Sequence, residues 1–338
     1  MYMKHTNRCI LIVHDTQKLL PLLALFASAY AGCAASPPPQ PLTARTPRAP
    51  DAFVTVWRTD EQGDVWIPTG DGRYLYDVDW DNDGVYDQQG ITGDARHHYG
   101  GRQTVTVRIR GRFDHFQGGR LPACWLLAVK QWGGLAWKSA REMFSGCSNL
   151  MALPSKAPDL RQVRDMSSMF SGATRFDQPL DHWDTSHVTN MSGLFRHAQR
   201  FNQPLEGWDT SQVTDMSGMF VGAIRFDQPL GTWNTARVTT MSRMFQDAYV
   251  FNQPLEGWDT SQVTDMSGMF AFTKAFDQPL NTWHIRSLRN TRNMFRGARA
   301  FSMPLDAWNL EEIDDTTDMF LDAREHPKAT HSDPARRP

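Results

Sequence analysis

The sequence predicts an α/β repeat solenoid that is preceded by a small β-sandwich. Three observations lead to this prediction. Large apolar residues recur every twenty-five positions over most of the C-terminal two thirds, apolar and polar residues alternate within residues 53–116, and a proline-rich stretch precedes both regions. Twelve Trp, sixteen Met and nineteen Phe in 338 residues supply the large side chains that such cores need.

The repeat is clearest in the segment FNQPLEGWDTSQVTDMSGMF, which occurs unchanged at residues 201–220 and 251–270. A period of this size indicates a solenoid, because one unit cannot bury its apolar face without its neighbours. Three columns of aromatic residues follow the period. They are Phe176, Phe201, Phe226, Phe251, Phe276 and Phe301; Trp183, Trp208, Trp233, Trp258, Trp283 and Trp308; and Phe170, Phe195, Phe220, Phe245, Phe270, Phe295 and Phe320, with Phe144 twenty-six residues before Phe170.

Each unit is expected to contain one short strand and one short helix. Met216, Met219 and Phe220 stand at i, i+3 and i+4, the spacing of one helix face. The segment 205–210 is the expected strand, with Pro204 at its entrance because proline cannot donate to a ladder. Asp and Asn alternate at the second position of successive units, which indicates that a block of two units was duplicated.

The region before the repeats has the pattern of β-structure. Residues 53–57, 74–78 and 104–110 are rich in β-branched and aromatic residues, and the last run alternates with period two. Gly-Asp, Asp-Gly and Gly-Gly pairs between the runs favour tight turns. We therefore predict a β-sandwich over residues 53–116, followed by the solenoid with a Trp-rich N-terminal cap over residues 117–323.

Four aspartates lie in one predicted turn of the β-region: Asp79, Asp81, Asp83 and Asp87. The pattern D-x-D-x-D-G imitates the start of a calcium loop, whose carboxylates supply hard oxygen ligands. An EF-hand needs an acidic residue at its twelfth position, where this chain has Gly90. Two interpretations stay open: a calcium site of another kind, or a turn stabilised by the aspartate side chains themselves.

The N-terminus has the features of an export signal over residues 1–33. Basic residues precede an apolar run at 19–30, which is too short to cross a bilayer as a mature helix. The run ends in YAGC, which resembles a bacterial lipobox except for its Tyr. That resemblance implies that Cys33 is lipidated and anchors the protein to a membrane; ordinary secretion with cleavage nearby is the alternative.

Two further segments have the composition of unfolded chain. Residues 34–52 are rich in proline and form the expected linker, and residues 324–338 form the expected disordered tail. Once the signal is removed and Cys33 is lipidated, Cys124 and Cys147 remain. In an exported protein this pair can form a disulfide, although two buried thiols are equally compatible with the sequence.

Charge and motifs argue against several classes of function. A formal net charge of −2 gives no electrostatic footprint for nucleic acid. The Met-x-x-Met pairs could bind copper(I), but their spacing is better explained by core packing. No familiar catalytic motif occurs, so we expect a protein that is not an enzyme and that needs no cofactor, apart from the calcium considered above.

The repeat unit F-[DN]-Q-P-L-x-x-W-[DN]-T-S-x-V-T-x-M-S-x-M-F-x-x-A resembles the 25–26-residue repeats of bacterial surface lipoproteins and the BspA-like leucine-rich repeats. The region YDVDWDNDG to TVTVRIRG resembles a PKD-type module. These resemblances imply a leucine-rich-repeat-like array that is lipid-anchored in the envelope, at the outer membrane or surface of a bacterium. They also imply non-catalytic adhesion to a protein or glycan ligand.

A second function remains open: an envelope-structural or carbohydrate-associating protein, in which the β-region binds and the array is a spacer. If the array is the binding part, its variable positions would form the contact face. These include Gln212, Arg237, Gln262 and Arg286.

Overall fold

The computed structural model describes residues 51–323. The predictions for the signal peptide, for most of the linker, for Cys33 and for the C-terminal tail concern residues outside this range. Within residues 51–323 no helix is both long enough and apolar enough to cross a bilayer.

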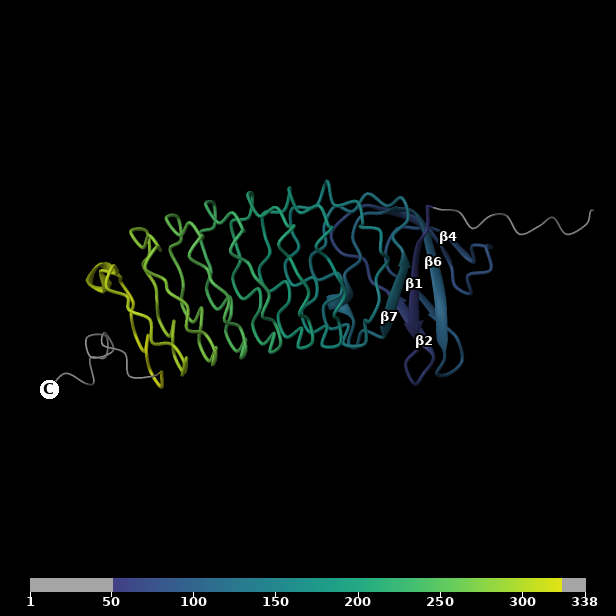
Figure 1. The fold of residues 1–338 in the computed structure, drawn as a ribbon. Helices are drawn as coiled ribbons and strands as arrows, with labels where there is room; N and C mark the ends of the chain where they lie inside the picture. Colours follow the sequence, from purple (N-terminus) through teal and green to yellow (C-terminus); the bar gives the residue numbers. More distant parts are fainter. Residues whose placement is uncertain (1–50, 324–338) are drawn as a thin grey trace, which may run out of the picture. The chain divides into compact units, whose positions relative to one another are not determined.

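The N-terminal part consists of two antiparallel sheets (Figure 1). The larger sheet has the order β4-β3-β6-β1-β7 and the smaller one pairs β2 with β5. Side chains from both sheets enter one core, where Phe53, Tyr76 and Ile109 are almost fully buried. The strands are β1 (Phe53–Arg58), β2 (Asp64–Ile67), β3 (Tyr74–Asp79), β4 (Gln88–Ile91), β5 (Ala95–His98), β6 (Thr104–Phe113) and β7 (Leu126–Gln131).

Strand β7 lies beyond the expected boundary at residue 116. It pairs with β1 on one side, and on the other Ala128 forms a parallel bridge to Ala152 at the start of the repeat region. The ring of Trp132 lies 6.1 Å from the ring of Phe144, the first phenylalanine of the repeats. The β-region therefore extends past residue 116 and shares its core with the repeat array.

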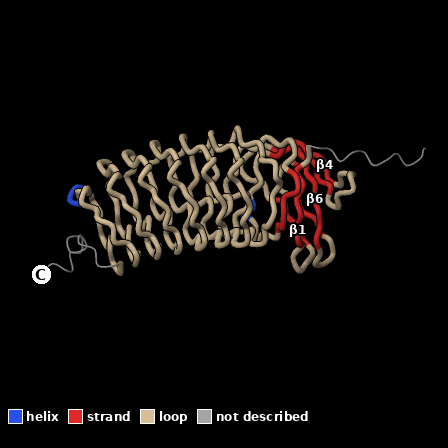
Figure 2. The backbone as a smooth tube through the Cα atoms, viewed as in Figure 1, coloured by secondary structure: helices blue, strands red, loops and turns tan. Residues whose placement is uncertain are grey.

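The expected helix in each unit is absent from the array, and this prediction is wrong (Figure 2). The only helical elements among residues 51–323 are two 3₁₀ turns, Gly118–Arg120 and Leu310–Glu312. In the segment expected to be helical, Gly218 has φ 60° and Gly222 has φ 66°. Two left-handed residues so close together cannot belong to an α-helix, in which φ is near −63° throughout.

The backbone of this segment instead bonds to the next coil. The N–H of Gly218 donates to the carbonyl of Ser242 at 2.7 Å, and that of Phe220 donates to Met244 at 2.8 Å. Bonds of this kind recur from coil to coil, so the coils lie side by side along the array (Figure 1). The spacing at i, i+3 and i+4 puts Met and Phe inward in this double turn, as it would in a helix.

The expected strand at residues 205–210 is also absent, because the structure has only turns and irregular backbone there. Strand-like pairing occurs ten residues later, in a ladder of single parallel bridges that joins one residue of each coil to its equivalent in the next. The ladder consists of Asp165, Asn190, Asp215, Thr240, Asp265, Asn290 and Asp315.

The interior of the array is formed by stacked aromatic rings, as the period predicts. The rings of Phe195, Phe220 and Phe245 follow one another at 5.6 Å, with interplanar angles of 11° and 5°. The tryptophans are buried as well, and the indole N–H of Trp233 donates to the carbonyl of Leu205 in the preceding coil at 2.9 Å. The fixed aromatic letters of the repeat are therefore inward-facing positions.

The alternating Asp and Asn form a polar ladder between coils. Asp177 Oδ1 accepts hydrogen bonds from the backbone of Asn202 at 3.1 Å and from Gln203 Nε2 at 2.8 Å. Asn202 Oδ1 does the same for Asp227 and Gln228, at 2.9 and 3.0 Å. At each position of this ladder the side chain needs only one oxygen that accepts these hydrogen bonds, which both Asp and Asn provide. Alternation with Asn keeps these bonds and leaves a neutral side chain between successive carboxylates, which lowers their repulsion.

Candidate functional site

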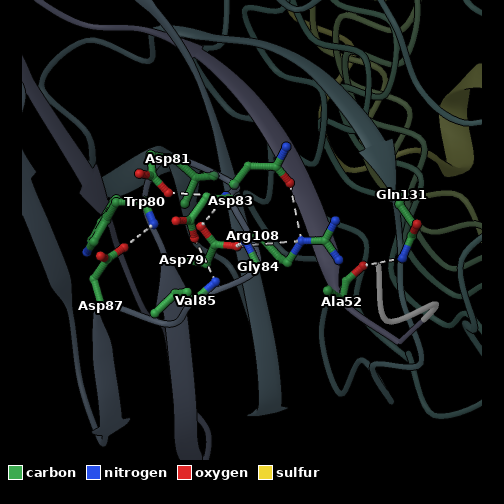
Figure 3. A network of polar contacts seen from close by, with 12 residues as sticks. Ala52, Asp79, Trp80, Asp81, Asp83, Gly84, Val85, Asp87, Arg108 and Gln131 are labelled. Atoms are coloured by element: carbon green, nitrogen blue, oxygen red, sulfur yellow. Dashed lines mark hydrogen bonds and ion pairs between the residues drawn. The ribbon is translucent and has the colours of Figure 1, made fainter. Parts of the chain in front are cut away.

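The four aspartates at the end of β3 and in the loop to β4 close this loop with hydrogen bonds (Figure 3). Each carboxylate accepts at least one backbone N–H from within residues 80–85. This is the pattern of aspartate-stabilised turns, in which the side-chain oxygen takes the place of a backbone acceptor. The donors are Asp83 and Gly84 to Asp79, Asp83 to Asp81, Val85 to Asp83 and Trp80 to Asp87, at 2.7–3.2 Å.

Three of these carboxylates also approach the arrangement of a cation site. Single oxygens of Asp79, Asp81 and Asp87 lie within 4.8 Å of one another. The positive group beside them is the guanidinium of Arg108, which is buried and has its Nε 3.9 Å from Asp79 Oδ2. Burial raises the pKa of the Asp79 carboxyl, and the N–H donors of Gly84 and Asp83 act against that shift. Arg108 would repel a cation at this position, so the contacts favour the hydrogen-bonded turn, and calcium binding remains a hypothesis.

Cys124 and Cys147 are joined in a disulfide. Cys124 lies two residues before β7 and Cys147 belongs to the first coil, so the bond links the β-region to the array. Both cysteines are buried. The sequence alone left the choice between a disulfide and free thiols open.

A hollow of about 530 Å³ lies in the β-region between strands β2 and β5 and residues 121–125. Its walls include Trp66 and Trp125, which are both half-buried. The guanidinium carbon of Arg96 lies 4.4 Å from the centre of the Trp66 ring, and that of Arg120 lies 5.5 Å away. These cations occupy the ring face that a sugar would need for stacking.

The array displays its variable positions on the outside. Arg237, Gln262 and Arg286 are exposed and Gln212 is half-buried. Arg237 donates from Nη1 to Gln212 Oε1 at 2.7 Å, so these two residues of neighbouring coils lie next to each other. All four positions belong to the stretch that follows the tryptophan of each unit.

Charged residues are unevenly distributed between two parts of the repeat when they are summed over the array. We define the Met segment as residues 166–175 and their equivalents up to 291–300, and the Trp segment as residues 176–190 and their equivalents up to 276–290. The Met segments carry nine Arg and Lys residues against one Asp, whereas the Trp segments carry eleven Asp and Glu residues against three Arg. Summed over the array, the Met segments are therefore basic and the Trp segments acidic, although the balance differs between coils: segment 276–290 carries two Arg against one Asp.

Two stretches of the chain, residues 138–248 and 228–332, match the family model described as "Mycoplasma protein of unknown function, DUF285". Together they span residues 138–332, which is more than half of the 338-residue sequence. The chain belongs to the DUF285 family. Both DUF285 matches fall on the repeat array and begin after β7, so the family is defined by the repeated part of the chain. Neither the curated proteins nor the solved structures show a significant match to this chain.

Sequence reasoning missed two features of this DUF285 protein: the hollow beside Trp66 and the sorting of charge. The hollow forms where segments distant in sequence come together, so no local sequence pattern predicts it. The sorting of charge does have a signal in the sequence, because it emerges when charges are grouped by their position within the repeat instead of being summed over the chain.

Proposed function

We propose that this protein is exported, is held in the bacterial envelope by lipid on Cys33, and binds a protein or glycan ligand through its repeat array without catalysis. One observation carries this proposal. The fixed letters of the repeat are used in the core and in the ladders between coils, so the outer positions are free to carry a binding surface. The resemblance of the unit to BspA-like surface repeats supports the same function, and a solenoid is the architecture that both arguments favour.

Two experiments test this proposal. Cells that express the full chain are expected to retain it in the membrane fraction and to incorporate labelled palmitate, whereas Cys33→Ser abolishes the label. The purified chain from residue 34 onward is then tested for retention on immobilised extracellular-matrix proteins and envelope glycans. If the wild-type protein takes up no palmitate label, the lipid anchor is disproved. If none of these surfaces retains the purified chain, the binding function is disproved.

A second candidate is the envelope-structural or carbohydrate-associating protein in which the β-region binds. The hollow beside Trp66 and Trp125 favours it, because aromatic side chains line many sugar sites. We rank it second because Arg96 and Arg120 already lie against Trp66. Under this alternative, Trp125→Ala abolishes retention on envelope glycans, whereas substitutions in the array leave retention unchanged.

A further inference from the structure

The basic Met segments contain a hollow of about 540 Å³ near the C-terminal end of the array. It lies across the coils that carry Arg243, Gly268 and Asn293 at equivalent positions. Its wall holds three arginines, Arg243, Arg292 and Arg296, and no acidic residue. The aliphatic stem of Arg243 passes over Gly268 of the next coil, where an added Cβ would lie 3.3 Å from Arg243 Cγ.

The arginines of this hollow are poorly neutralised. Among residues 51–323, Arg243 and Arg296 make no ion pair, and Arg292 reaches Asp315 only at 3.9 Å. Two buried polar atoms at the hollow also have no hydrogen-bond partner within the described chain: Nε of Arg296 is an unused donor and Oδ1 of Asn293 is an unused acceptor. Both atoms are enclosed by the surrounding side chains, so the groups that a carboxylate can reach from the hollow are the outer parts of the arginine side chains that line it.

Apolar side chains accompany these charges. Phe272 lines the hollow and is 38% exposed, and Tyr249 and Val250 of the preceding coil are 38% and 45% exposed. Large exposed apolar groups beside arginines are typical of binding surfaces. The C–H face of a sugar ring can pack on a side chain such as Phe272 while an acidic substituent meets a guanidinium.

The basic character continues along the array. Arg175, Arg200 and Arg225 occupy the same position in three successive coils, and all three are exposed. The rings of the neighbouring Phe176, Phe201 and Phe226 column are 6.0 Å apart at each step. This column ends before the hollow, where the equivalent positions are Val250, Ala275 and Ala300. Cations repeated from coil to coil suit an extended polymer that carries charges at regular intervals better than one compact ion.

A peptide main chain would find little to bind on this surface. The backbone N–H of Arg243 already donates to Ser267 at 2.8 Å, and that of Phe245 donates to Met269 at 2.9 Å. The segment therefore has no open edge to which an extended peptide could add as a strand. The attraction must come from the ligand's own charged and hydroxyl groups.

We propose that the Met-segment face binds an acidic polysaccharide, with the carboxylate of one sugar held by Arg243 and Arg296. This inference rests on the proposed binding function of the array and specifies its ligand class. Guanidinium groups suit the ligand because their planar fork can form two hydrogen bonds with a carboxylate.

The test uses the chain from residue 34 onward and fluorescently labelled alginate, a linear polymer of uronic acids, with neutral dextran of similar length as the negative control. The site variant is Arg243→Gln with Arg296→Gln. The matched control is Arg112→Gln with Arg164→Gln, which removes the same charge from two exposed arginines that lie outside the Met segments and line neither hollow. Thermal unfolding of all three proteins verifies that each remains folded.

Wild type and control are expected to bind alginate equally and dextran not at all, and the site variant is expected to lose at least tenfold in affinity. Raising the salt concentration should weaken binding to alginate, because exposed charges are screened. Equal affinity of site variant and control would overturn the assignment to this hollow. Tighter binding to polyglutamate or to single-stranded DNA than to alginate would overturn the ligand class. Retention on matrix proteins without alginate binding would overturn only this inference, whereas retention on no surface would also remove the proposed function.

Discussion

The stacked rings of the array predict a large and local cost for removing one of them. Phe220 is fully buried, with its ring 4.0 Å from Phe226 and 5.6 Å from both Phe195 and Phe245. Substitution Phe220→Ala deletes a side chain that is held from both neighbouring coils. Since the backbones of those coils are hydrogen-bonded in register, they cannot move together to fill the space. We therefore expect a loss in the upper part of the usual range of about 3–5 kcal/mol in the free energy of unfolding.

This prediction is measured by chemical denaturation of the chain from residue 34 onward, followed by circular dichroism. Leu75→Ala is the control, because Leu75 is also a large apolar residue but is 54% exposed. Its loss should stay within about 0.5 kcal/mol of wild type. If Phe220→Ala cost less than about 1 kcal/mol, or no more than Leu75→Ala, the stacked core would not be what stabilises the array.

Three further outcomes are expected. Burial lowers the pKa of His115 below its usual 6.5, so the unfolded chain takes up a proton before the folded chain does as the pH falls. The stability from neutral His115 is therefore complete above about pH 6.5 and declines below it by up to about 1.4 kcal/mol per pH unit. Thermal unfolding at pH 5–8 should show this decline in wild type and a weaker one in His115→Gln. Replacing Cys124 and Cys147 by Ser should cost about 2–4 kcal/mol, since they close a loop with a sequence separation of 23 residues; an unchanged denaturation midpoint would contradict this. Millimolar calcium should leave the melting temperature unchanged, because the aspartates already accept hydrogen bonds from the loop's own backbone and Arg108 lies beside Asp79. A rise that chelation reverses would establish the metal site instead.

The array could be predicted from the sequence because the positions of its buried aromatic residues repeat at a fixed interval. A twenty-five-residue period in Phe and Trp requires that equivalent residues meet in a common interior, and the stacked rings confirm this. Three strands of the larger antiparallel sheet were predictable for a similar reason, since residues 104–110 alternate strictly and belong to β6, whereas strands β2 and β5 of the smaller sheet were not identified. The sequence identified Cys124 and Cys147 as the candidate pair but did not show whether they form a disulfide, because sequence spacing does not give the distance between two thiols.

The sequence by itself therefore determined the period and the inward-facing positions of the repeat. The end of the β-region, at β7 and not at residue 116, followed only from the structure. Tertiary structure decided the path of the backbone. Met216, Met219 and Phe220 point inward either in a helix or in a double turn, and the choice depends on whether the N–H of Gly218 finds its acceptor in its own coil or at Ser242 of the next. It also decided that charged residues which share a position in the repeat are gathered on the same part of the array, because the hydrogen bonds between coils place equivalent residues side by side.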